Sequence, residues 1–166
     1  MNAEALAERL ASRFPDATVA REEITAVVEA AGLLSALAWL RDEPDLAFDW
    51  LSDIAATDWP GRAPRFWVVW HLYSMEHHHR LRVKVGLAEE DPHVPSVTEL
   101  FPTANWLERE VYDLMGVVFD GHPELTRILM PDDWDGHPHR KDYALGGTGT
   151  MYKHGASIPP VDERGS

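Results

Sequence analysis

Three adjacent histidines, His77, His78 and His79, are the most obvious candidates for metal chemistry in this sequence. Imidazole nitrogens are common zinc ligands, but a tetrahedral site needs ligands that converge on one point. The side chains of consecutive residues diverge, and no partner that would orient their rings is apparent. The pattern therefore favours a solvated loop over a metal site, and we interpret His137 and His139 in the same way.

Carboxylates at positions 108, 110 and 113 could in principle act as a general acid and a general base. Residues two apart on a helix point away from each other, so Glu108 and Glu110 do not converge. Glu110 and Asp113 are three apart and can converge, while Arg109 can pair with Asp113 four residues on. Local spacing thus favours an exposed ion-pair face over catalysis.

Other catalytic signatures are missing from the sequence. The segment 146–149, Gly-Gly-Thr-Gly, has no Lys-Ser/Thr behind it and makes a poor phosphate cradle, and no Gly-x-Ser-x-Gly elbow occurs. The sequence contains no Cys, so it offers no thiolate for an iron–sulfur cluster, a disulfide or thiol catalysis. We therefore predict no catalytic, cofactor-binding or metal-binding residue on this chain, and expect an interaction role instead.

Composition narrows the partners. The 166 residues carry a formal net charge of −13, with 28 acidic and 15 basic side chains. This balance argues against a nucleic-acid binder, which needs a basic face, and against docking on anionic lipid. Seven tryptophans are many for one domain, and tryptophan often anchors one protein chain in another. A protein partner is the expectation that fits these numbers best.

Targeting signals are not evident. The N-terminus lacks the basic-then-apolar pattern of a secretion signal. The longest uncharged, mostly apolar run, residues 30–40, is too short to span a bilayer. We expect a chain that is soluble by itself and reaches a membrane only through a partner.

Three helices are predicted from apolar spacing. Residues 3–14 carry apolar side chains every four positions, residues 33–41 form a second helix, and residues 105–115 form a third. Asn105 with a carboxylate three residues on resembles an N-terminal cap, and Gly116 is the expected stop. A capping-box pattern at residues 96–99 predicts a further short helical turn.

Strands are predicted from alternation and β-branched content. Residues 66–73 and 81–87 form a hairpin joined by a polar loop, and this is the clearest pair. Residues 50–57 and 24–28 are predicted as further strands. One domain is expected over residues 1–145, followed by an extended Gly- and Pro-rich tail, residues 146–166.

Between Trp106 and Tyr143 the sequence is unusually dense in charges, turn residues and aromatics. Such a stretch suits a polar interface with another chain. Residues 106–116, Trp-Leu-Glu-Arg-Glu-Val-Tyr-Asp-Leu-Met-Gly, resemble the core signature of the thirty-kilodalton subunit family of complex I, the NuoC-like subunits of bacterial NADH:quinone oxidoreductase. Residues 119–129 resemble its second half, and residues 137–143 its closing motif, with His139 where Leu is usual.

The resemblance implies an α+β fold, with a mixed or antiparallel β-sheet whose helices pack mainly on one face. It also implies a scaffold subunit in the peripheral arm of a proton-translocating oxidoreductase, at the cytoplasmic face of the plasma membrane. Its expected partners are the large subunit of the forty-nine-kilodalton type (NuoD-like) and the small iron–sulfur subunits (NuoB-like and NuoI-like). The resemblance implies no cofactor on this chain, with FMN and iron–sulfur clusters on partner subunits.

Carrying the signature over by position gives a set of expected interface and turn residues. The set is Glu108, Arg109, Glu110, Asp113, Gly116, Gly121, His122, Pro123, Arg127, Arg140, Lys141, Asp142 and Tyr143. Gly116 and Gly121 are expected to serve backbone turns. An alternative for Glu108 and Arg127 in particular is an internal ion pair that fixes the fold.

Two other functions remain open at this level. One is the equivalent subunit of a related complex, such as a membrane-bound nickel–iron hydrogenase, a deazaflavin-linked dehydrogenase or a photosynthetic complex I relative. The other, from a different class, is a stand-alone metal-dependent hydrolase that would use the histidines at 77–79, 137 and 139.

Overall fold

The structure, a computed structural model, describes residues 3–21 and 23–143. The predicted tail, residues 146–166, lies outside the described residues. Helices and strands follow each other in this order: α1 (Ala3–Leu10), β1 (Thr18–Ala20), β2 (Glu23–Val27), η1 (Ala30–Gly32), α2 (Leu33–Asp42), β3 (Trp50–Asp58), β4 (Phe66–Tyr73), β5 (Arg80–Leu87), β6 (His93–Pro95), α3 (Ala104–Met115) and β7 (Val118–Asp120).

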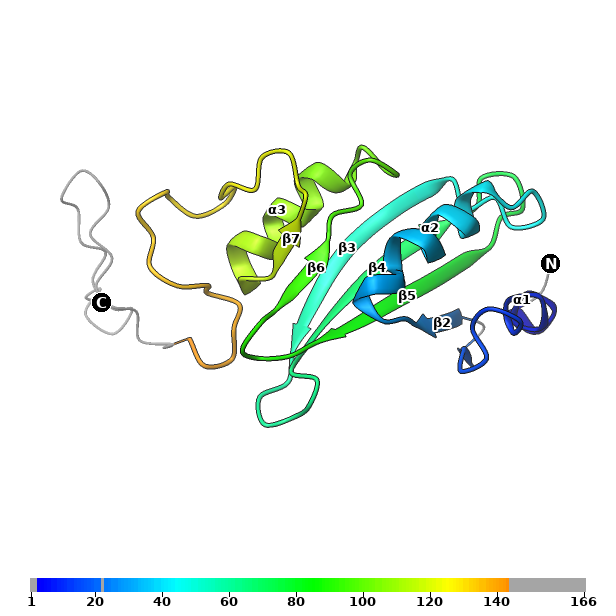
Figure 1. Cartoon of the computed structure of the whole chain (residues 1–166), viewed down its shortest axis with the longest axis horizontal. Coiled ribbons are helices and arrows are strands. Elements are labelled where there is room, and N and C mark those ends of the chain that lie inside the picture. Colours follow the sequence, from blue (N-terminus) through cyan, green and yellow to red (C-terminus); the bar gives the residue numbers. More distant parts are fainter. Residues whose placement is uncertain (1–2, 22, 144–166) are drawn as a thin grey trace, which may run out of the picture.

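The main sheet has five strands in the order β1-β2-β5-β4-β3. The pairs β1–β2, β5–β4 and β4–β3 are antiparallel, whereas β2 and β5 run parallel. The strands β6 and β7 form a separate parallel pair beside α3 (Figure 1). The architecture is therefore α+β with a mixed sheet, as expected from the resemblance.

Alternation along the hairpin decides which face of the sheet is covered. Phe66, Val68, Trp70 and Leu72 of β4 are buried, and the odd positions of β5 from Leu81 onward are buried opposite them. Strand side chains alternate between the two faces, so one face of the sheet forms the core. The other face carries partly exposed aromatic and basic side chains.

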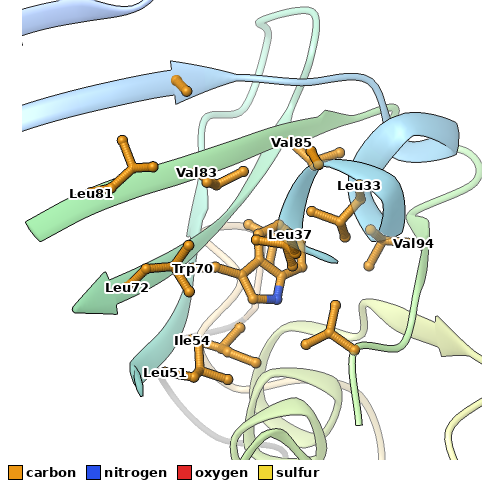
Figure 2. Packing of buried hydrophobic residues seen from close by; sticks show 14 of the residues in the cluster. Leu33, Leu37, Leu51, Ile54, Trp70, Leu72, Leu81, Val83, Val85 and Val94 are labelled. Atoms are coloured by element: carbon orange, nitrogen blue, oxygen red, sulfur yellow. The ribbon is translucent and has the colours of Figure 1, made fainter. Parts of the chain in front are cut away.

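The core lies between that covered face and the helices. Figure 2 shows Leu33 and Leu37 of α2 directed toward Trp70 and Val85 of the sheet. The buried side chains of α1, α2 and α3 belong to the same cluster. The expectation that helices pack on one face is thus confirmed.

Most predicted elements are present with small differences at their ends. The α1 helix ends at Leu10, four residues before Phe14, yet Leu6, Leu10 and Phe14 are all buried as the spacing predicted. The strand β1 is an addition that the sequence did not predict, because its three residues are all exposed and show no alternation.

The predicted capping box at 96–99 does not form. The Ser96 hydroxyl instead donates to the Glu108 carboxylate, 2.7 Å away, and the Ser96 amide donates to the Asp120 carbonyl. Glu99 is exposed. A turn is still present, since the amides of Leu100 and Phe101 donate to the Val97 carbonyl. The pairing of β6 with β7 thus takes precedence over local capping.

Among the described residues, no helix is both long enough and apolar enough to cross a membrane.

Candidate functional site

The candidate site is built around α3, the helix that carries the core of the signature. Its end matches the prediction, because Gly116 caps it in the left-handed conformation with φ +73° and its amide donates to the Tyr112 carbonyl at 2.8 Å. Its start differs by one residue. Asn105 lies inside the helix, and Thr103 is the N-cap without a side-chain hydrogen bond.

Glu108 lies in the first half of α3 and is fully buried. One carboxylate oxygen accepts a hydrogen bond from the Ser96 hydroxyl, and the other accepts one from the Val97 amide, each at 2.7 Å. Burial raises the pKa of Glu108 to about 7, and these two hydrogen bonds only partly oppose that effect. The prediction of an exposed ion-pair face is wrong for this residue, since α3 turns it toward β6.

His122 reaches the same interior from the turn after β7. Its Nδ1 accepts a hydrogen bond from the Glu124 amide, so its Nε2 carries the proton and faces the Asn105 carbonyl at 3.1 Å. Nε2 also lies 4.0 Å from the Glu108 carboxylate, and both side chains are fully buried. The two residues therefore fix the turn at 120–124 against the start of α3.

Asp113 lies in the second half of α3 and is also fully buried. Its Oδ2 accepts hydrogen bonds from three successive amides, those of residues 128, 129 and 130, at 2.7 to 3.0 Å. Its Oδ1 pairs with the Arg127 guanidinium at 2.6 Å. Burial alone raises the pKa of Asp113, but the three amides and Arg127 outweigh it, so the pKa is lowered.

The arginines of the signature bond to backbone carbonyls. Arg127 donates to the carbonyls of Trp134 and Gly136, each at 3.0 Å, in addition to pairing with Asp113. Arg109 does not pair with Asp113, as the helical spacing had suggested. It donates instead to the carbonyls of Thr126 and Arg127, each at 3.1 Å. Both arginines thus fold residues 124–136 over α3.

The closing motif packs against the end of α3. The Arg140 side chain donates to the Met115 carbonyl at 2.7 Å, and the His137 ring contacts the Asp113 carbonyl at 2.9 Å. Burial lowers the pKa of His137, so it stays neutral in this position. The ring and guanidinium lie so close to Gly116 that a Cβ there would meet them at 2.5 and 2.6 Å. Glycine is needed here for space as well as for φ.

A second ion cluster, which the sequence did not predict, holds the last described residues to the main sheet. The buried Arg65 pairs with the fully buried Asp58 at 2.8 Å and with Asp142 at 2.8 Å, and also contacts Glu89. The Lys141 amide donates to Asp58 at 2.8 Å. Asp58 and Arg65 flank the turn between β3 and β4, and their spacing alone gave no signal of a buried pair.

The remaining residues of the expected set are at or near the surface. Glu110, Gly121, Pro123 and Lys141 are exposed. Gly121 has φ +82°, which confirms its role in a backbone turn. Tyr143 contacts the Asp135 carbonyl through its hydroxyl at 3.4 Å. These positions stay predictions for an interface.

The histidine candidates have separate structural partners. His77 contacts the Pro44 carbonyl, His78 the Tyr73 hydroxyl and His79 the Leu46 carbonyl. His79 is buried, and burial lowers its pKa. Within residues 3–21 and 23–143, no group of three His, Cys, Asp or Glu residues could hold a metal ion.

Comparison with known proteins gives a consistent result. The model of the family described as "Respiratory-chain NADH dehydrogenase, 30 Kd subunit" matches residues 26–149. The chain is 53% identical over 148 residues to the NuoC subunit of NADH-quinone oxidoreductase from Saccharopolyspora erythraea, covering 89% of this chain and 59% of that protein. It is 49% identical over 147 residues to the same subunit from Mycolicibacterium paratuberculosis, covering 88% and 62%. The chain thus spans about three fifths of the length of these relatives.

Two solved structures share the fold. A trypsin-resistant fragment of Nqo5 matches with a TM-score of 0.64 and 33% identity, over 75% of this chain and 100% of the fragment. A chain of the membrane-bound sulfane sulfur reductase, an archaeal respiratory membrane complex, matches with a TM-score of 0.72 and 26% identity, over 86% of this chain and 85% of that one.

Proposed function

This chain belongs to the family of the thirty-kilodalton subunit of respiratory-chain NADH dehydrogenase, and we propose that it is a non-catalytic scaffold subunit of a proton-translocating NADH:quinone oxidoreductase. In this role it stands in the hydrophilic, peripheral arm and holds electron-carrying neighbours in register. The observation that carries the proposal is the family match over residues 26–149, which includes the main sheet, α3 and the segments folded over it.

The use of the buried polar side chains supports a scaffold role. Glu108 is hydrogen-bonded to residues 96 and 97, and Asp113 is bonded to residues 127–130. Catalytic carboxylates need a face that a substrate can reach, and both of these are fully covered by their own chain. Their hydrogen bonds fix the shape of a surface, which is the requirement for holding other subunits in place.

Redox chemistry is assigned to the neighbours. The sequence has no Cys, and thiolates are the usual ligands of iron–sulfur clusters. We therefore place FMN and the clusters on partner subunits. The proposed partners are the large NuoD-like subunit and the small iron–sulfur subunits, and the chain reaches the cytoplasmic face of the membrane only through them.

Affinity purification from the native host tests this proposal. The tagged full chain is purified in mild detergent, and the chains that co-purify are identified by mass spectrometry. We expect the large NuoD-like subunit and the iron–sulfur subunits in amounts close to that of the tagged chain. Recovery of the chain without any large oxidoreductase subunit would falsify the proposal.

The likeness to a chain of the sulfane sulfur reductase favours one alternative, a place in a related membrane-bound respiratory complex with another electron donor. The same purification separates the two. Co-purification of a flavin subunit that binds NADH supports the first proposal. Co-purification of the large and iron–sulfur subunits without any NADH-binding subunit supports the alternative.

A further inference from the structure

Two large apolar side chains near α3 are exposed although their backbones are firmly held. Trp106, in the first half of α3, has 61% of its surface exposed, and Leu129, in the segment folded over the helix, has 55%. An exposed apolar side chain on a mobile loop is ordinary. A pair on a fixed framework is different, since it loses little conformational entropy when a partner covers it.

Asp113 fixes the backbone on both sides of Leu129. Its Oδ2 accepts the amides of Ile128, Leu129 and Met130 at 3.0, 2.7 and 2.8 Å. Met130 packs against the core, whereas Leu129 faces solvent. The buried carboxylate therefore holds Leu129 outward with Met130 as its anchor.

Arg109 links this segment to Trp106. Its guanidinium carbon lies 5.1 Å from the centre of the Trp106 ring, and its nitrogens donate to the carbonyls of Thr126 and Arg127. The same guanidinium thus contacts the exposed ring and the residues just before Ile128. Trp106 and Leu129 are carried by one connected framework.

Acidic side chains accompany this apolar pair. Between residues 99 and 135, all of which the structure describes, every exposed charged side chain is a carboxylate. The two arginines of this stretch, at 109 and 127, are only partly exposed and bond to carbonyls of their own chain. The exposed carboxylates are those of Glu99, Glu110, Asp120, Glu124, Asp132, Asp133 and Asp135.

We propose that Trp106 and Leu129 form the apolar centre of a docking surface for a different protein chain, which presents an apolar recess bordered by lysine or arginine side chains. The proposal rests on the scaffold function above and names the chemistry of one partner. Carboxylates around the apolar centre favour a basic border on the partner. They oppose a second copy of this acidic chain and an anionic lipid surface, because like charges would face each other.

The first test compares assembly of variants in the native host. The double variant Trp106→Ala, Leu129→Ser is expected to lower the amount of co-purifying oxidoreductase subunits roughly tenfold or more, since buried aromatic anchors dominate interface energetics. Trp59→Ala is the matched control. Trp59 is 46% exposed and has Arg62 at 4.8 Å from its ring, but it lies in the turn between β3 and β4. This control is expected to assemble as the wild type does.

The second test needs no loss of assembly. Because the sequence has no Cys, Leu129→Cys introduces a single thiol into this chain. Maleimide labelling of that thiol, read by mass spectrometry, is expected to be fast in the isolated full chain and strongly reduced in the purified complex. Trp59→Cys is expected to label in both states. Equal labelling of the thiol at position 129 in both states, or protection already in the isolated chain, overturns the proposal.

The outcomes separate this inference from the proposed function. If wild type recovers no oxidoreductase subunit, the scaffold function itself fails. If wild type recovers them and the double variant recovers them equally, only the docking surface is wrong. A melting curve of the isolated double variant that matches wild type shows that any loss of assembly is not a loss of fold.

Discussion

The two halves of α3 each bury one carboxylate, and the two carboxylates are held in opposite ways. Glu108, in the first half, receives two neutral hydrogen bonds and lies beside a neutral histidine ring. Asp113, in the second half, receives three amides and a guanidinium. The pKa of Glu108 is raised to about 7, whereas that of Asp113 is lowered.

The difference shows that burial alone does not decide the charge of a carboxyl group. Burial opposes ionisation at both sites, and the number and charge of the donors decide the result. Asp113 remains ionised and organises the segment 126–130 around itself. Glu108 exchanges its proton near neutral pH and joins the start of α3 to β6. The second half of the helix is thus fixed by charge, and the first half depends on pH.

The largest effect is expected from Asp113→Ala. It leaves the Arg127 guanidinium and three amides without their acceptor, and losing one partner of a buried ion pair costs roughly 3–5 kcal/mol. Urea unfolding measures this loss, and amide exchange at residues 128–130 is expected to accelerate. Asp133→Ala, at an exposed position, is the control and should change little.

Glu108→Gln tests the pH dependence of the first half. The carboxyl keeps its proton up to about pH 7 in the folded chain but loses it near pH 4.5 when unfolded. The folded chain therefore binds more protons in this window, and its free energy of unfolding falls as pH rises. Gln stays neutral and should lack this fall, which amounts to on the order of 3 kcal/mol between pH 4.5 and 7. Parallel pH profiles for the two chains would rule this out.

Asp113 gives the opposite sign in acid. Its pKa is lowered on folding, so its contribution is present above the ordinary value of 3.8 and is lost as pH falls through the folded value. Asp113→Ala should therefore differ least from wild type at the lowest pH. The two variants together should show whether acid and neutral pH act on different halves of α3.

Gly116→Ala probes the end of the second half. A positive φ costs a side-chain residue roughly 1–2 kcal/mol, and the new Cβ would also meet His137 and Arg140. Gly121→Ala is matched in φ but has nothing within 4 Å of the added Cβ. Thermal melts of both variants should give the larger loss at Gly116, and equal losses would show that the contact with residues 137 and 140 adds nothing.

Ser96→Ala is the mildest change. It removes one of the two donors to Glu108, which costs about 1 kcal/mol. Because that donor favours the charged form, the pKa of Glu108 should rise further and the loss should be greater at pH 8 than at pH 5. Thr98→Val is the control, since Thr98 contacts the Ser96 hydroxyl but not Glu108. A loss that does not vary with pH would show that Ser96 acts on the fold by another route.

Several elements were open to prediction because their causes are local. The hairpin of β4 and β5 follows from period-two alternation, and its bounds agree with the predicted strands to within one residue. The buried faces of α1 and α2 follow from apolar spacing, and the end of α3 from a glycine at the stop position. The family resemblance carried the fold class further than these patterns could.

The surroundings of the site were not open in this way. Glu108 and Asp113 are five residues apart, which is about 140° around a helix, so they share no face and neither belongs to the apolar stripe. Spacing on α3 could exclude a joint active site. It could not show that β6 covers one carboxylate and that residues 126–130 cover the other.

The sequence by itself therefore determined the main helices, the hairpin, the glycine turns and the family. The tertiary structure decided which charged side chains are buried and with which partners they bond. Asp58 and Lys141 are 83 positions apart, yet the Lys141 amide donates to the Asp58 carboxylate. Local patterns record what a segment can form, whereas the charge state of a carboxyl group depends on the distant segment that folds over it.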